Sequence, residues 1–257
     1  HLRLVGLPMD DEGLRPDALI EACRKTGARV LYCVPNYQNP TTACMSPTRR
    51  AAIATIARDH DLIVIEDDVY GFLRSDPISP IVQDIPERTC YITGLSKIVG
   101  PGLRIGYAVV PENLLEPVAA AIRATCWSAA PLGGEIATRW INDGTIDELI
   151  DWHRREAAAR QDMPRRILGH LTYRCEPGSY HLWLELPAPW RADELVDAAR
   201  THDVRLISVE PFLVGRGAMP HALRLTLGPP SRPELERGLQ VIADLLADPP
   251  RPTAAVM

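Results

Sequence analysis

The stretch Leu62-Ile63-Val64-Ile65, which runs directly into Glu66-Asp67-Asp68, decides how this chain is expected to fold. A continuous apolar run that is rich in β-branched residues is typical of a strand buried on both faces of a sheet. Similar runs occur at Val30–Val34, Thr89–Thr93 and Leu103–Val110. Helical patterns lie between them, at Pro16–Lys25 and after Ser46-Pro47, a serine N-cap followed by proline. Strands that alternate with helices predict an α/β fold with a mostly parallel sheet covered on both faces.

The second half of the chain changes in character after Pro111. Helical patterns cover 112–125 and 132–142, and a long amphipathic stretch runs from Thr145 to about Leu168. Further strands are expected at Leu2–Leu7, Tyr180–Leu186, Val204–Val209 and Ala222–Leu227, and further helices at Ala192–His202 and Pro233–Leu246. We therefore expect a large domain over 1–142, an interdomain helix over 143–168 and a small α+β domain over 169–257, with a frayed tail from Pro249.

The composition excludes several classes of protein. The 257 residues carry a net charge of −5 and scattered basic residues, which argues against nucleic-acid binding by this segment itself. No apolar run reaches the ~18 residues of a membrane helix. The six cysteines form no CxxC pair and the seven histidines no HExxH motif, so no metal site is expected. A cytoplasmic protein fits these observations.

Polar side chains follow three of the predicted strands, in the segments 36–41, 67–70 and 93–97. Because parallel strands end at the same edge of a sheet, these segments are expected to converge. Lys97 is one of two lysines in a chain with 28 basic residues, the other being Lys25. It directly follows a strand and precedes a Pro-Gly turn, where a merely solubilising charge is poorly placed. The sequence therefore predicts a chemical site around Lys97.

The motifs at this predicted edge resemble a known family. Asn39-Pro40-Thr41, Asp67-x-x-Tyr70, Ser96-Lys97 and Pro101-Gly102-Leu103-Arg104 are similar in order and spacing to the class I/II aminotransferases, and Leu223-Arg224-Leu225 extends the match. That family comprises enzymes of fold type I that depend on pyridoxal 5'-phosphate (PLP) and act as homodimers. The resemblance implies amino-group transfer between an amino acid and a 2-oxo acid through an imine of PLP with Lys97.

The resemblance also implies a role for each matched residue. Asp67 would hold the pyridine nitrogen protonated, and Asn39 and Tyr70 would donate to the ring phenolate. Ser96 and Arg104 would grip the phosphate, and Arg224 would take the substrate α-carboxylate as a bidentate fork. Asp68 is an alternative to Asp67. Adjacent strand residues point to opposite faces, and Asp67 stands three residues before Tyr70 as the family pattern requires.

Two other functions remain open on the sequence. The detailed sequence of these motifs, such as Tyr37-Gln38-Asn39-Pro40 and Glu66-Asp67-Asp68, is most similar to the aminotransferase-like domain of MocR-type regulators. Two alternatives to an aminotransferase are therefore a PLP-binding effector domain of a MocR/GntR-type transcription regulator and an inactive truncated relative. The family carries a further segment before the point that matches His1, so the large domain is expected to be incomplete at its N-terminus and to bind PLP weakly.

Two positions depart from the family pattern. Thr42 stands where the family usually has glycine after Asn-Pro-Thr. Gly94 stands where many members have a phosphate-binding serine, three residues before the lysine. Both departures lie in segments assigned to the site, so they put the phosphate contacts in question.

Overall fold

Strand β4 (Ile63–Asp67) lies inside a four-stranded sheet, as its apolar run predicted, in the strand order β3-β4-β5-β6. Its neighbours β3 (Val30–Cys33) and β5 (Thr89–Gly94) both run parallel to it. The fourth strand, β6 (Gly106–Val109), is antiparallel to β5. The mostly parallel sheet is thus confirmed, and the sheet is mixed because the last strand returns along its neighbour without a crossover helix.

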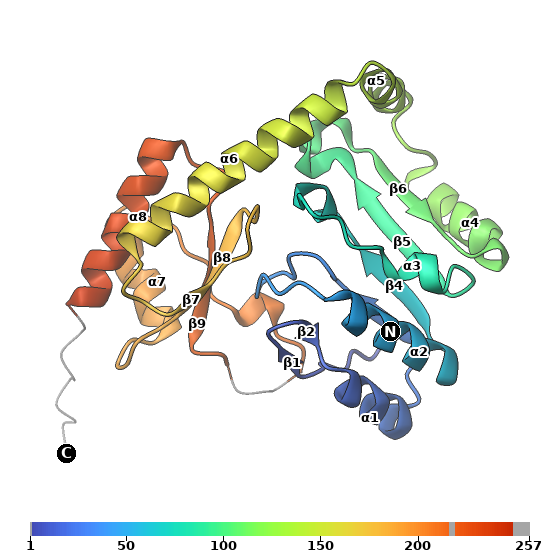
Figure 1. Ribbon diagram of the computed structural model, residues 1–257, viewed down its shortest axis with the longest axis horizontal. Helices are drawn as coiled ribbons and strands as arrows, with labels where there is room; N and C mark the ends of the chain where they lie inside the picture. The colour runs from blue at the N-terminus through green and yellow to red at the C-terminus, as the bar shows by residue number, and fades with distance from the viewer. Residues whose placement is uncertain (1, 216–218, 249–257) are drawn as a thin grey trace. The chain divides into compact units, whose positions relative to one another are not determined.

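The computed structural model describes residues 2–215 and 219–248 (Figure 1). The chain divides into two units. The first, called the N-terminal unit here, contains Leu7–Gln38 and Ala43–Arg155. The second, the C-terminal unit, contains Asn39–Thr42, the chain from Glu156 onward and the residues before Leu7. The predicted domain boundaries at 142 and 168 stay predictions.

The N-terminal unit joins the sheet to helices and short turns. A small hairpin is formed by β1 (Met9–Asp10) and β2 (Gly13–Leu14). The helices are α1 (Pro16–Thr26), α2 (Pro47–Asp59), α3 (Ile81–Asp84), α4 (Leu115–Cys126), α5 (Pro131–Asn142) and the first part of α6 (Thr145–Ile167). Single 3-10 turns are η1 (Gly71–Leu73), η2 (Leu95–Lys97), η3 (Pro101–Leu103) and η4 (Glu112–Leu114). Helix α2 begins as predicted, because the Ser46 side chain accepts a bond from the Arg49 amide.

Helices cover one face of this sheet. Leu31 and Val64 are buried there in a core with side chains of α1, α2 and α3. On the opposite face Val30, Tyr32 and Ile92 are 56%, 61% and 37% exposed. The prediction of a sheet covered on both faces is therefore wrong for the described residues: the apolar runs supply two apolar faces, but the buried core forms on one.

The C-terminal unit has its own antiparallel sheet, β7-β8-β9, formed by Tyr173–Arg174, His181–Glu185 and Ala222–Thr226. The second part of α6, α7 (Ala192–Arg200) and α8 (Arg232–Ala247) supply the rest of its elements, together with the turn η5 (Glu210–Phe212). Leu182, Leu184 and Leu223 are fully buried at its core. The predicted smaller α+β pattern is present, and the short strand β7 was missed.

Two predicted strands are wrong. Segment 204–209 forms only an isolated bridge between Ile207 and Arg224. It leads into η5, whose Pro211 has no amide hydrogen to continue a ladder. Within the predicted strand Leu2–Leu7, residues 2–7 have no regular structure, and Leu2 and Leu4 are exposed without a partner strand. The frayed tail lies outside the described residues. None of the helices in residues 2–215 and 219–248 has the length and apolar character needed to cross a bilayer.

A buried arginine ties α2 to the ends of the strands. Arg50 is 1% exposed, and its Nη2 donates to Asn36 Oδ1 at 2.6 Å. Its Nε and Nη1 donate to the carbonyls of Met45 and Ser79 at 3.2 and 3.3 Å. Burial lowers the pKa of Arg50. Each of these acceptors would lose its partner if the guanidinium were removed.

We expect Arg50→Met to lower the free energy of unfolding by about 3–5 kcal/mol, the loss typical of breaking one side of a buried charged network. Methionine keeps the apolar stem and removes every donor. Urea unfolding followed by circular dichroism measures the change. Arg155→Met on the exposed part of α6 is the control, with an expected change within about 0.5 kcal/mol. A loss below about 1 kcal/mol for Arg50→Met would contradict this assignment.

Candidate active site

The three consecutive carboxylates at the end of β4 have three different surroundings. Glu66 is fully buried, and its two oxygens accept bonds from the amides of Ile81 and Val82 at 2.9 and 3.0 Å, at the start of α3. Burial raises the pKa of Glu66. This side chain is therefore a helix cap.

Asp68 faces the same covered side of the sheet as Glu66. It is 8% exposed, and its oxygens accept bonds from Asn36 Nδ2 at 2.7 Å and from the Tyr91 hydroxyl at 2.8 Å. A Cβ added to Gly71 would lie 2.4 Å from both Asp68 oxygens, so a side chain at this point would displace the Asp68 carboxylate. The Asp68 carboxylate thus holds the strand ends and the turn together.

Asp67 points to the opposite, open face. The hydroxyl of Tyr32 on β3 donates to its Oδ2 at 2.7 Å. Desolvation, followed by the bond to Asp67, raises the pKa of Tyr32. Sequence reasoning missed Tyr32, although strand alternation, which places every second residue on one face, was the signal that could have found it. The geometry of all three carboxylates agrees with the choice of Asp67 over Asp68, which stays a prediction.

Lys97 and Tyr70 are brought together at the same edge. Lys97 ends turn η2 after β5, and its Nζ lies 5.5 Å from the centre of the Tyr70 ring. Lys25, the other lysine, lies on α1, where it is exposed and paired with Glu21, which raises its pKa. The two lysines therefore differ in setting: one is a solvated surface charge and the other lines a pocket.

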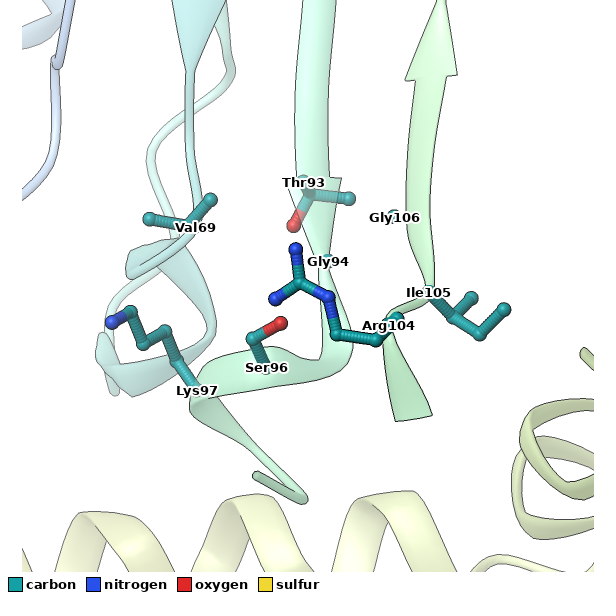
Figure 2. Close-up of a pocket in the computed structure, with 8 residues that line it drawn as sticks. All are labelled: Val69, Thr93, Gly94, Ser96, Lys97, Arg104, Ile105 and Gly106. Atoms are coloured by element: carbon teal, nitrogen blue, oxygen red, sulfur yellow. The ribbon is translucent and has the colours of Figure 1, made fainter. Parts of the chain in front are cut away.

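That pocket has a volume of about 250 Å³ and is lined by residues from three segments (Figure 2). Val69 comes from the loop after β4, and Arg104 comes from the segment before β6. The end of β5 and the turn η2 contribute Thr93, Gly94, Ser96 and Lys97. In this view the Arg104 guanidinium lies between the hydroxyls of Thr93 and Ser96, while Lys97 extends toward the Val69 side. Val69 and Thr93 are lining residues that the sequence did not assign.

Gly94 and Thr42, the two departures, have local explanations. A Cβ on Gly94 would lie 3.2 Å from the Ile105 carbonyl oxygen, so a side chain there would crowd the pocket wall. Thr93, whose hydroxyl donates to the Asp68 carbonyl at 3.2 Å, brings a hydroxyl to the pocket instead. Thr42 is buried with φ +66°, in the left-handed region that glycine adopts at least cost.

Asn39 and Arg224 meet within the C-terminal unit, although 185 positions separate them along the chain. Arg224 Nη1 donates to Asn39 Oδ1 at 2.7 Å, which turns the Asn39 oxygen toward the guanidinium. Arg224 also lies 5.1 Å from the centre of the Phe212 ring. It stands on β9 opposite Trp183 of β8. Asn39, predicted to contact the ring phenolate, and Arg224, predicted to bind the substrate α-carboxylate, are thus neighbours.

The pocket fits a phosphorylated aldehyde. An ammonium, a guanidinium and the Ser96 hydroxyl line it, which is a donor set suited to an amine-reactive group carrying a phosphate. Among residues 2–215 and 219–248 no group of three or more His, Cys, Asp or Glu side chains is placed to hold a metal ion. PLP therefore suits the residues that line the pocket.

Comparison with known proteins agrees with this geometry. The model of the family "Aminotransferase class I and II" matches residues 7–242. The HTH-type transcriptional regulator YdeF of Bacillus subtilis is 31% identical over 96% of the chain and 54% of its own length. Aromatic-amino-acid aminotransferase 1 of Thermococcus litoralis is 26% identical over 95% of the chain and 61% of its own length. The chain thus spans about half to three fifths of the length of these relatives.

Solved structures show the same fold. The crystal structure of Pyrococcus horikoshii kynurenine aminotransferase, in complex with PMP, matches with a TM-score of 0.87 and 26% identity, over 95% of this chain and 63% of that one. The multiple substrate aminotransferase of Thermococcus profundus matches with a TM-score of 0.85 and 26% identity, over 93% and 62%. The architecture is that of fold type I, the fold of PLP-dependent aminotransferases. The motifs and the fold match, and the family model covers nearly the whole length of this chain. The chain therefore belongs to the class I and II aminotransferase family.

Proposed function

We propose that this chain forms the PLP site of an aminotransferase, which moves an amino group from an amino acid to a 2-oxo acid. One observation carries the proposal: Lys97, set 5.5 Å from the Tyr70 ring, shares a pocket with Arg104 and two hydroxyls. When bound, PLP supplies an aldehyde that reacts with amines and a ring that takes up electrons.

The residues of the N-terminal unit divide the work. Arg104 and Ser96 would hold the phosphate by charge-assisted hydrogen bonds. Asp67, whose Oδ2 accepts the bond from Tyr32, would keep a proton at the pyridine nitrogen, and Tyr70 would donate to the ring oxygen. Lys97 would provide the amine that reacts with the aldehyde, and its amine would then be the group placed to move a proton on the substrate.

The residues of the C-terminal unit serve the substrate side. Arg224 binds the α-carboxylate through the flat guanidinium fork. The bond from its Nη1 to Asn39 and the neighbouring Phe212 ring hold that fork in one orientation. Asn39, whose oxygen accepts the bond from Arg224, is the residue that the family pattern assigns to the ring phenolate, and this role stays a prediction.

Arg224→Lys is expected to raise KM for amino acids about 10²-fold and to leave kcat within about tenfold, because lysine keeps the charge and loses the bidentate geometry, including the bond to Asn39. Steady-state kinetics with an amino acid and a 2-oxo acid measure both constants. Arg205→Lys, on the exposed part of the segment before η5, is the control and should behave as the parent protein. An unchanged KM would remove Arg224 from the carboxylate site.

The direct test of the proposal is to locate the PLP adduct. The protein is mixed with PLP, treated with borohydride, digested and mapped by mass spectrometry. The mass of a reduced phosphopyridoxyl group is expected on the peptide that contains Lys97. A label on Lys25 alone, or on neither lysine, would refute the proposal.

The homodimer implied by the family stays a prediction. Light scattering of the protein as it elutes from a size-exclusion column tests it.

A second candidate function rests on the similarity to YdeF and to two other HTH-type regulators of Bacillus subtilis. The same Lys97 site would then bind PLP and respond to an amine without turnover. This alternative predicts an absorbance change on adding an amine without release of a 2-oxo acid. Release of 2-oxo acid in repeated turnovers would exclude it.

A further inference from the structure

Two neighbouring side chains of α6 reach the two turns that carry site residues. Turn η1 directly follows Tyr70, and turn η2 ends at Lys97. His153 Nε2 lies 2.7 Å from the carbonyl oxygen of Ile98, the residue after Lys97. Arg154 Nε donates to the carbonyl oxygen of Phe72 at 3.0 Å. A carbonyl can only accept, so His153 carries its proton on Nε2.

His153 also connects the two turns to each other. Its ring lies edge-on to the Phe72 ring of η1, with the ring centres 6.2 Å apart, while its Nε2 binds next to η2. Both turns pack into one apolar cluster with α5 and α6. Phe72 contributes from η1, and Leu95 and Ile98 contribute from η2 and the residue after it. In Figure 2 a helix runs beneath the turn that bears Lys97.

These contacts satisfy carbonyls that a one-turn 3-10 helix leaves without partners of its own. Within η2 the amides of Ile98 and Val99 bond to the Leu95 carbonyl at 3.0 and 2.8 Å. The Ile98 carbonyl oxygen instead meets Nε2 of His153. Without that donor, the turn loses its bond to α6 at the residue adjacent to Lys97.

We propose that His153 and Arg154 are positioning residues, which hold the turn that ends at Lys97 and the turn that follows Tyr70, so that the lysine amine meets the cofactor aldehyde. The inference rests on the proposed function for the meaning of Lys97, but the contacts themselves can be tested without PLP. Neither side chain lines the pocket.

The first arm of the test measures amide hydrogen exchange without PLP. His153→Phe keeps the ring and removes the donor, and it should speed exchange at Ile98 and Val99 about tenfold. Arg154→Met should do the same at Leu73 and Arg74, whose amides bond within η1. His153→Gln, which restores a donor, should recover most of the protection. Arg155→Met, the adjacent exposed position, should change nothing.

The second arm measures the rate at which PLP forms a borohydride-fixed adduct at Lys97. We expect this rate to fall about tenfold in His153→Phe and to recover in His153→Gln. Ile53→Val, which trims the core around α2, controls for lost stability and should keep the parent rate. Three results would overturn the inference. They are parent-like exchange in both His153→Phe and Arg154→Met, an unchanged adduct rate in His153→Phe, and a fall in the adduct rate of Ile53→Val as large as that of His153→Phe. A parent protein without any adduct would refute the proposed function, and the exchange arm would still decide whether these side chains hold the turns.

Discussion

Replacing Lys97 with alanine is expected to abolish the borohydride-fixed PLP adduct and to lower the transamination rate by roughly 10⁵-fold, a loss typical of removing a covalent nucleophile. No other lysine can take its place in the pocket, because Lys25 lies on α1 and not among the lining residues. The fold should be retained, since Lys97 lies at the end of a turn and is exposed. Adduct mapping and coupled assays of 2-oxo acid release measure the two effects.

Lys25→Ala is the matched control, because it removes the only other lysine amine of the chain. That side chain is 71% exposed and its ammonium is paired with Glu21, so its removal should leave adduct and rate unchanged. A reducible adduct that survives Lys97→Ala and disappears in Lys25→Ala would reverse the assignment of the two lysines.

Replacing Asp67 with asparagine is expected to lower kcat by about 10²–10³-fold, the magnitude found when one preorganised electrostatic contact to a transition state is lost. Asparagine keeps the shape and can still accept the bond from Tyr32, but it lacks the charge that holds a proton on the ring nitrogen. Steady-state kinetics at saturating substrate measure the loss.

Asp68→Asn separates chemistry from structure, because it makes the same change on the opposite face of the sheet. Its carboxylate bonds to Asn36 and Tyr91, so we expect a loss of stability of about 1–3 kcal/mol and a kcat within about tenfold of the parent. Equal losses of kcat in the two variants, or a greater loss in Asp68→Asn, would contradict the choice of Asp67.

Most of the fold was predictable because its strands are continuous apolar runs. Strand β4 and its parallel neighbours follow from that pattern, and α2 follows from Ser46-Pro47. The antiparallel direction of β6 did not follow, since a strand has the same side-chain pattern in either direction. Segment 204–209 is mostly apolar and resembles a strand, but pairing depends on a partner strand, and Pro211 limits it, neither of which the local pattern shows.

The site was predictable where the residues lie close in sequence to strand ends. The meeting of Lys97 with Tyr70 follows from parallel strands that end at one edge. Contacts that depend on tertiary structure were not visible. The bond from Tyr32 to Asp67 spans 35 positions, and the bond from His153 to Ile98 spans 55. Their side-chain types are common, so only the folded chain shows what they touch.

The central claim, amino-group transfer at Lys97, is tested most directly with a mixture of ¹⁵N-labelled amino acids and the PLP-loaded protein. The account predicts that the label appears in pyridoxamine phosphate, with one 2-oxo acid formed for each label transferred and none formed in Lys97→Ala. A parent protein that binds PLP at Lys97 and transfers no ¹⁵N from any amino acid would contradict the claim.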